Sequence, residues 1–232
     1  VETEAQWLKR LCHHKNVVTM YDFTRQGLLL ERADFDLYSL LHHEVDAEFP
    51  MVRYSADLFR GLAFLAEEGV CHLDIKPENL LITKGVLQLA DFGTAVTEGE
   101  ESMGGHTPCY RAPEIVLDLP CGPASDVWSA CCVLYEMLTC CEGHGPFYLF
   151  DLENHWLLGM EDLEEDDDLK ETLTHLFLME QVIGHPFPTQ MRDPTFFHHR
   201  GALKHVLWHQ GRKEESFLGM LMEEDGVKDE ND

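Results

Sequence analysis

The chain is poor in basic residues, with 17 lysines and arginines against 43 aspartates and glutamates and a formal net charge of −26. Nucleic acid phosphates would be repelled by this charge, so we expect no direct nucleic-acid ligand. Long apolar runs are lacking as well. The apolar stretch 127–141 is shorter than the roughly 20 residues of a membrane span and contains Glu136, so we expect no membrane contact.

Familiar metal-site and targeting patterns are also absent. The eight cysteines and 14 histidines include neither a C-x₂-C nor an H-E-x-x-H spacing, so no structural zinc site is predicted. Adjacent cysteines at 131–132 and 140–141 lie within an apolar helical run, which predicts buried thiols. Buried thiols favour a reducing compartment, the cytoplasm or the nucleus. No secretory signal is recognisable.

The most informative segment of the chain extends from Cys71 to Asn79. It contains a carboxylate at Asp74, an amine at Lys76 and an amide at Asn79, and Asp91 follows downstream in Asp-Phe-Gly. Carboxylate and amide oxygens are suitable ligands for Mg²⁺, and a carboxylate can accept the proton of a hydroxyl group. The set therefore suits ATP-dependent phosphoryl transfer. Asp-Phe-Gly alone would indicate only a turn.

Two short apolar segments, residues 80–82 and 86–89, separate Asn79 from Asp91. They predict a small β-hairpin, because each has the length and the residue types of a short strand. Such a hairpin would return the chain and bring Asp91 back beside Asp74. The interpretation of the site depends on this convergence.

These motifs resemble the catalytic core of eukaryotic protein kinases, in which the loop follows H-R-D-x-x-x-x-N and the metal motif is D-F-G. Two further segments occur in the family's order, Thr-Pro-Cys-Tyr-Arg-Ala-Pro-Glu at 107–114 and Ser-Asp-Val-Trp-Ser at 125–129. The resemblance extends over roughly residues 1–220. It implies an α+β, protein-kinase-like fold and a serine/threonine protein kinase that uses ATP and Mg²⁺.

The resemblance also assigns roles to single residues. It implies that Asp74, Lys76, Asn79 and Thr107 are catalytic, with Asp74 orienting the substrate hydroxyl and Lys76 typical of serine/threonine kinases. Asn79 and Asp91 would bind the metal. The resemblance also implies a set of nucleotide-binding residues, which includes a helix glutamate, the gatekeeper, the hinge and the adenine floor. They are Glu4, Leu30, Glu31, Ala33, Asp36, Leu81 and Asp91.

By the same resemblance, residues 1–33 would be the remnant of a small β-rich lobe, with one helix and two strands. Residues 34–232 would form a mainly helical large lobe, with an acidic flexible insert near 151–171. We also expect a buried helix from about Asp126 to Cys140.

Asp126 allows a physical prediction of its own. A carboxylate in this position would be costly to bury without hydrogen-bond donors, so we expect it to accept bonds from the backbone of the loop that contains Asp74. The resemblance further implies a row of stacked side chains in line with it: Leu8, Met20, Phe92 and His72.

The chain departs from the family pattern in several places. No G-x-G-x-x-G loop and no Val-Ala-Ile-Lys strand precede Glu4, so the chain resembles a kinase domain truncated at both ends, and we expect it to bind ATP poorly. Leu73 stands where most kinases have the arginine that binds an activation-loop phosphate. No arginine partner for Glu114 is identifiable. A second hypothesis therefore stays open, a non-catalytic, pseudokinase-like interaction module.

The kinase subgroup is predicted from short motifs. The arginine in the segment 110–114 is typical of the CMGC group, which contains the cyclin-dependent, MAP, Clk and SR-protein kinases. Segment 176–188 resembles a segment of the same group, and segment 196–205 resembles SR-protein and Clk-type kinases. With the negative net charge, this favours a basic, Arg/Ser-rich protein substrate. The alternative is that the acidic runs at 161–168 and 223–232 are merely solvated. No oligomeric state is predicted.

Overall fold

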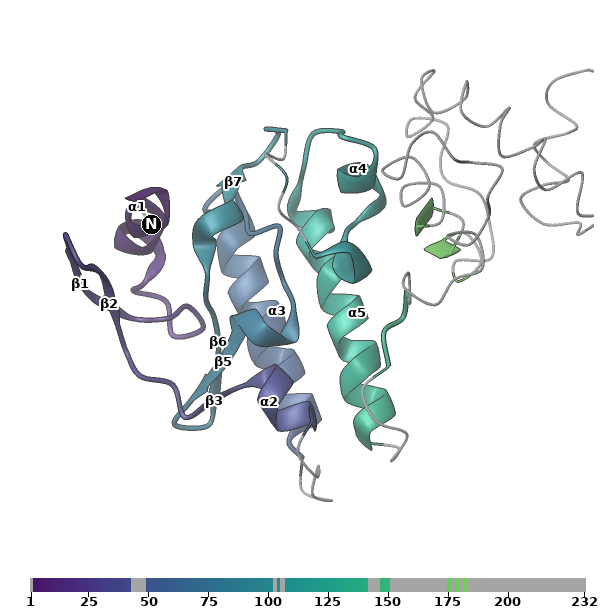
Figure 1. Cartoon of the computed structure of the whole chain (residues 1–232), viewed down its shortest axis with the longest axis horizontal. Helices are drawn as coiled ribbons and strands as arrows, with labels where there is room; N and C mark the ends of the chain where they lie inside the picture. Colours follow the sequence, from purple (N-terminus) through teal and green to yellow (C-terminus); the bar gives the residue numbers. More distant parts are fainter. Residues whose placement is uncertain are drawn as a thin grey trace, which may run out of the picture. The chain divides into compact units, whose positions relative to one another are not determined.

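The computed structural model describes residues 2–42, 49–101, 104, 107–141 and 147–150, together with 175, 176, 178, 179 and 182 (Figure 1). The chain divides into two units, Val1–Asp151 and Leu152–Asp232. In the second unit the described residues are helical, and His175, Leu176 and Met179 are buried. The predicted insert at 151–171 and the subgroup segment at 196–205 lie outside the described residues.

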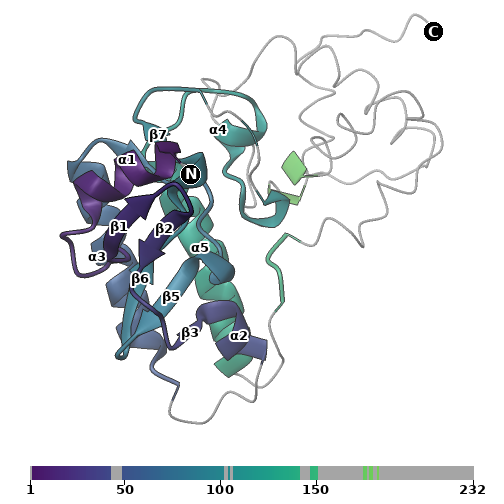
Figure 2. The same ribbon diagram turned by 60° about the vertical axis from the view of Figure 1, so that its left-hand side comes forward.

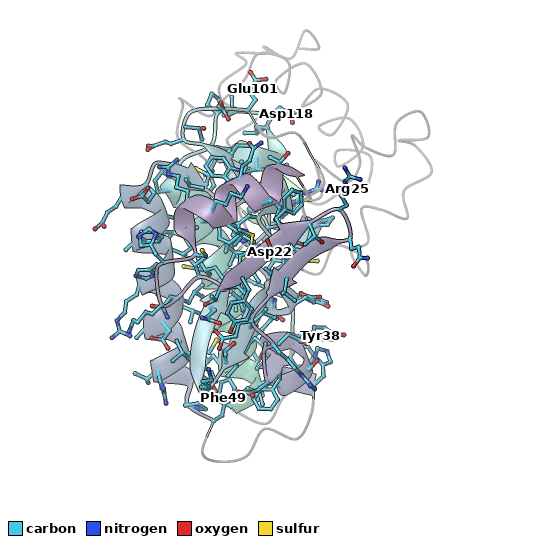
Figure 3. The ribbon with its side chains drawn as sticks, turned by 90° about the vertical axis from the view of Figure 1, so that its left-hand side faces the viewer. Asp22, Arg25, Tyr38, Phe49, Glu101 and Asp118 are labelled. Carbon is cyan, nitrogen blue, oxygen red and sulfur yellow. The ribbon has the colours of Figure 1, made fainter. Side chains whose placement is uncertain are left out.

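The first unit begins with an amphipathic helix, α1 (Glu2–Leu11), which buries Ala5, Leu8 and Leu11 on one face. An antiparallel hairpin of β1 (Met20–Thr24) and β2 (Gly27–Leu30) follows, and α1 lies against it in both views (Figures 1 and 2). Figure 3 shows Arg25 at the tip of this hairpin. One helix and two strands are what the sequence predicts for residues 1–33, and the assignment of these residues to a separate lobe stays a prediction.

A three-stranded antiparallel sheet follows in the order β3 (Phe35–Asp36), β5 (Leu80–Thr83), β6 (Val86–Leu89). The predicted hairpin of residues 80–89 is thus confirmed. Lys84 and Gly85 form its turn with φ angles of 52° and 74°, the left-handed geometry that matches the twist of a two-residue hairpin. Beyond the sheet, Val17 forms a parallel bridge to Leu89, so the segment after α1 is joined to the sheet.

Two long helices form the main core of the first unit. The helices α3 (Met51–Glu67) and α5 (Pro123–Cys141) pack side by side (Figure 1), and α3 also packs on β6. A shorter helix, α2 (Leu37–His42), precedes α3. The predicted helix from Asp126 to Cys140 is confirmed to within one turn at its start.

Both cysteine pairs on α5 were predicted to be buried, but only one cysteine of each pair is. Cys132 and Cys140 are buried, but their neighbours Cys131 and Cys141 are exposed. The prediction of buried pairs was wrong because consecutive residues on a helix are about 100° apart around its axis and cannot face the same core. The argument from buried thiols to a reducing compartment is weakened accordingly.

The remaining elements are short. The strands β4 (Val70–Cys71) and β7 (Val96–Thr97) pair antiparallel, and α4 (Pro113–Val116) precedes α5. The described part of the first unit also contains three 3₁₀ turns: η1 (Pro77–Asn79), η2 (Phe92–Thr94) and η3 (Pro108–Tyr110). Helices with small sheets agree with the predicted α+β class. In the part of the chain described, no helix combines the length and apolar character needed to cross a membrane.

Candidate active site

The loop that contains Asp74 is fixed from behind by α5. Asp126, buried in the first turn of α5, accepts the backbone N–H of His72 at 2.7 Å and that of Leu73 at 2.8 Å. Two backbone donors offset the cost of burying this carboxylate, as predicted. Leu73 has a φ of 67°, an unusual angle for a branched side chain, and these bonds help to hold it there.

The predicted row of stacked side chains is present in part. The rings of His72 and Phe92 lie 4.7 Å apart between centroids, and the His72 Nε2 is 2.9 Å from the carbonyl oxygen of Ala90. Leu8 is fully buried and Met20 is half-buried. The loop before Asp74 and the segment around Phe92 are therefore joined by both packing and a hydrogen bond.

Asp74 is surrounded by the three other residues predicted to be catalytic. Its Oδ2 accepts a hydrogen bond from Asn79 Nδ2 at 2.8 Å and lies 3.0 Å from Lys76 Nζ. Its Oδ1 accepts from Thr107 Oγ1 at 3.1 Å, and Lys76 Nζ donates to the same Thr107 oxygen at 2.8 Å. The structure thus brings Asp74, Lys76, Asn79 and Thr107 together, and their catalytic roles stay predictions.

The electrostatics of this group keep Asp74 ionised. Burial alone would raise the pKa of Asp74, but the hydrogen bond and charge of Lys76, with the hydrogen bonds of Thr107 and Asn79, outweigh burial and lower the pKa below its ordinary value. A carboxylate that is charged at neutral pH can orient a hydroxyl group and accept its proton.

Asp91 stands at the start of η2, close to Asn79. The backbone N–H of Ala90 donates to the carbonyl oxygen of Asn79 at 3.0 Å, so the chain entering Asp91 is bonded to the residue that ends η1. Asp91 has left-handed backbone angles, φ 61° and ψ 76°, and its Oδ1 accepts the N–H of Gly93 at 3.2 Å. A Cβ at Gly93 would lie 3.1 Å from this oxygen, a tight contact that the Asp91 carboxylate would have to relieve by a small shift.

The residues predicted to bind Mg²⁺ have suitable donor chemistry. Asn79 Nδ2 donates to both the carbonyl oxygen and Oδ2 of Asp74, which fixes the amide and leaves its oxygen for another partner. Asp91 is exposed and supplies a carboxylate. Within the described residues, no cluster of three histidines, cysteines or acids could hold a metal by itself. The set therefore fits Mg²⁺ bound together with substrate phosphates and water.

Glu4, on the first turn of α1, lies within electrostatic range of Asp91. Burial and then the charge of Asp91 raise the pKa of Glu4 above its ordinary value. Two carboxylates that repel each other create a place where a cation would be stabilised. In the part of the chain that the structure describes, no ion pair joins a lysine or arginine to Glu4.

The predicted hinge residues lie where β2 leads into β3. Leu30 ends β2 opposite Met20, and Glu31 donates its backbone N–H to Thr19 at 2.8 Å. The Glu31 carboxylate forms an ion pair with Lys84 at 2.8 Å, across to the turn of the β5–β6 hairpin. Ala33 is half-buried. This ion pair was not predicted, and the nucleotide roles of the segment stay predictions.

Asp36 and Leu81 lie opposite each other across β3 and β5, and both are half-buried. The Asp36 carboxylate accepts the backbone N–H of Ser39 at 2.7 Å and its hydroxyl at 2.8 Å, which caps α2. The sequence predicted a ribose contact for Asp36, and the structure adds a capping role that occupies both carboxylate oxygens.

Leu73 belongs to a small apolar cluster, with Cys71, Ala112, Ile115 and Cys121 as its other buried members. An arginine in place of Leu73 would have to leave this cluster or be buried without a partner. The apolar side chain therefore joins the loop before Asp74 to the segment before α5 by packing alone.

Glu114 has a partner that sequence reasoning missed. The Ser125 hydroxyl, just before Asp126 on α5, donates to Glu114 Oε1 at 2.5 Å. The sequence offered no arginine for Glu114, and the motif Ser-Asp-Val-Trp-Ser drew attention to Asp126 alone. Within the described residues, Glu114 is thus joined to α5 by a hydrogen bond from serine.

Glu136 is the functional candidate that the sequence analysis did not identify. It lies on α5 with 1% of its surface exposed, and the Tyr110 hydroxyl donates to its carboxyl group. Its Oε1 has no hydrogen-bond partner among the described residues. Burial, and to a lesser degree the charge of the exposed Glu78, raises the pKa of Glu136 to about 7. The available signal was an acid within an otherwise apolar helix.

Comparison with known proteins agrees with the site geometry. The family model of the protein kinase domain matches residues 1–177. The chain is 31% identical over 231 residues to MAP3K epsilon protein kinase 1 of Brassica napus, covering 90% of this chain and 17% of that protein. It is 39% identical over 180 residues to serine/threonine-protein kinase GIN4 of Saccharomyces cerevisiae, covering 70% of this chain and 15% of that protein.

A third relative, mitogen-activated protein kinase kinase kinase 3 of Arabidopsis thaliana, is 34% identical over 154 residues, covering 60% of this chain and 23% of that protein. The chain thus spans less than a quarter of the length of each of these three relatives. Their names do not support the narrower prediction of an SR-protein or Clk-type kinase. The match over residues 1–177 nevertheless shows that the chain belongs to the protein kinase domain family.

Proposed function

We propose that the protein containing this chain transfers the γ-phosphoryl group of ATP to a serine or threonine hydroxyl of a protein substrate. The observation that supports this most directly is the Asp74 carboxylate, held by Lys76, Asn79 and Thr107. Each of these residues provides a function that phosphoryl transfer needs. One of the relatives is named as a serine/threonine-protein kinase.

In this proposal Asp74 orients the substrate hydroxyl and accepts its proton. Lys76 Nζ, already within 3.0 Å of Asp74 Oδ2, places a positive charge beside the acceptor oxygen. Thr107 fixes both groups through its hydroxyl. The oxygens of Asn79 and Asp91 would hold Mg²⁺, which when bound neutralises the negative charge of the phosphates.

We propose further that the substrate is basic near the acceptor residue. Glu78 is exposed and lies between Asp74 and Asn79 on the same loop, and Glu136 lies near it with one carboxyl oxygen unpartnered among the described residues. A substrate arginine or lysine would pair with the exposed Glu78, whereas the buried Glu136 would add only to the negative charge behind it. The net charge of −26 would increase the encounter rate with such a peptide. The kinase subgroup stays a prediction.

The test replaces Asp74 with asparagine, which preserves the shape of the side chain but removes the base. We expect Asp74→Asn to lower the rate of phosphate transfer from radiolabelled ATP to an Arg/Ser-rich peptide by about 10³-fold or more. The matched control is Asp118→Asn on the surface, where the left-handed backbone tolerates asparagine (φ 52°). Stabilisation of both variants by Mg²⁺ and ATP in thermal unfolding gives a readout that does not depend on transfer.

Unchanged transfer by Asp74→Asn would refute the assignment of the base. A basic peptide that is phosphorylated no better than its Arg→Gln counterpart would refute the substrate proposal while leaving the kinase proposal intact.

A non-catalytic role is the second candidate, and one observation favours it. Glu4 and Asp91 are within electrostatic range of each other, and no ion pair to Glu4 is present in the described residues. If Glu4 remains without a cationic partner, the phosphates would be bound poorly. Absence of both nucleotide-dependent stabilisation and phosphate transfer, in the unsubstituted chain and in Asp74→Asn alike, would support this candidate.

A further inference from the structure

A groove of about 550 Å³ lies at the start of α3, and its lining shares no residue with the Asp74 site. The floor is apolar, with Phe49, Met51, Val52 and Ala56. Figure 3 shows Phe49 at the end of the first unit opposite Glu101 and Asp118. Val52 is 84% exposed, so its apolar side chain is open to a partner at the start of the helix.

Two arginines on α3 border this apolar floor. Arg53 and Arg60 both line the groove, and none of the described residues that line it is acidic. The two side chains lie seven positions apart, which places them on the same side of the helix two turns from each other.

The two guanidinium groups have different environments. Arg60 donates to Asp57 at 2.9 Å, yet 55% of its side chain stays exposed. Arg53 lies against the β5–β6 turn, where a Cβ on Gly85 would be 3.5 Å from both of its terminal nitrogens. Within the described part of the chain, no ion pair is formed by Arg53. Arg53 therefore contributes to the rim a positive charge that no described residue neutralises through an ion pair.

We infer that this groove is a docking site for an extended peptide that carries an apolar side chain between acidic residues. The apolar side chain would cover Val52 and Ala56, and the flanking carboxylates would pair with Arg53 and Arg60. Charge complementarity favours this occupant over a basic or neutral one, because a basic segment would meet two like charges. On a chain with a net charge of −26, a local positive border of this kind is distinctive. Peptide binding at this groove would not require phosphoryl transfer at the Asp74 site.

The test uses fluorescence anisotropy with the complete 232-residue chain. The probe is a fluorescein-labelled nine-residue peptide with a central leucine and two glutamates on each side, and the comparison peptide has glutamine for every glutamate. We expect saturable binding of the acidic probe, which weakens when the salt concentration rises from about 50 to about 500 mM. The glutamine peptide should bind about tenfold more weakly or not at all.

Two variants assign the binding to the groove. The double variant Arg53→Glu with Arg60→Glu should weaken binding by about tenfold or more, and Val52→Asp should weaken it as well. Arg25→Glu, on the exposed turn between β1 and β2, is the matched control and should leave the affinity unchanged. All are exposed positions, and unaltered far-ultraviolet circular dichroism would show that the fold is retained.

Several outcomes would overturn the inference. They are equal binding of the acidic and glutamine peptides, binding that survives the Arg53/Arg60 double reversal, and the absence of saturable binding by the acidic probe. Binding to vesicles that contain phosphatidylserine is measured as well. If they bind in an Arg53-dependent manner while the peptide does not, the groove recognises an anionic surface and the peptide proposal is wrong.

Discussion

Replacement of Glu136 by glutamine should stabilise the protein at neutral and alkaline pH. The carboxyl group is almost fully buried, and its pKa is raised from the ordinary value of 4.5 to about 7. The folded state therefore binds the proton more tightly than the unfolded state. Stability from the protonated carboxyl is fully present below the unfolded pKa of 4.5 and is lost as the pH rises through about 7. Glutamine resembles the protonated form at every pH.

The difference between the ordinary pKa of 4.5 and the raised pKa of about 7 sets the size of the change in stability. It corresponds to roughly 3 kcal/mol in the free energy of unfolding, because one pKa unit corresponds to about 1.4 kcal/mol. Linkage then predicts that Glu136→Gln exceeds the unsubstituted chain in stability by about 1 kcal/mol at about pH 5.5 and by about 3 kcal/mol at about pH 8. This window avoids the isoelectric point near 4.7, where solubility is lowest.

Urea denaturation followed by circular dichroism measures this difference at each pH. Glu101→Gln is the matched control, because Glu101 is exposed and is not among the groups that raise the pKa of Glu136, so its replacement should leave the pH dependence of stability unchanged. A constant offset between Glu136→Gln and the unsubstituted chain across this pH range would contradict the reasoning. So would a variant that is less stable at high pH, since it would mean that the ionised carboxyl is well solvated or paired.

Three further substitutions test the packing around the site by the same denaturation assay. Asp126→Ala leaves two buried N–H groups without acceptors and should cost about 3 kcal/mol, whereas a loss under 1 kcal/mol would show that these groups find water. Leu73→Arg introduces a charge into the apolar cluster and should cost about 3 kcal/mol more than Leu73→Met, and equal losses would indicate that the arginine reaches solvent. Gly61→Ala places a Cβ 3.0 Å from the side chain of the buried Leu89. It should destabilise the fold by about 1 kcal/mol despite the better helix propensity of alanine, and a gain in stability would show that the Leu89 side chain moves aside at little cost.

Much of the local structure could be predicted from the sequence because it depends on short-range patterns. The hairpin of residues 80–89 follows from two apolar segments around a turn, and the hydrogen bonds of Asp126 follow from the cost of burying a carboxylate. The gathering of Asp74, Lys76, Asn79 and Thr107 rests on the resemblance to kinases, since Thr107 is distant in the chain from the other three.

The features that the sequence did not predict depend on which way a side chain faces in the folded chain. The sequence contains Glu136 as an acid in an apolar run, but only packing decides that it is buried beside Tyr110. Likewise Asp36 caps α2 because Ser39 stands three residues later in that helix, and Cys131 is exposed because it faces away from the core. Such choices are set by tertiary contacts that a single sequence does not reveal.

The attachment of the Asp74 loop to Asp126 also governs how this loop can fluctuate. The amide hydrogens of His72 and Leu73 are enclosed by a carboxylate on the longest helix of the first unit, so they can exchange with solvent deuterium only when the start of α5 opens. The residues nearest the chemistry should then rank among the slowest to exchange, although they belong to no regular element. A loop held this way would keep its shape between encounters with substrate.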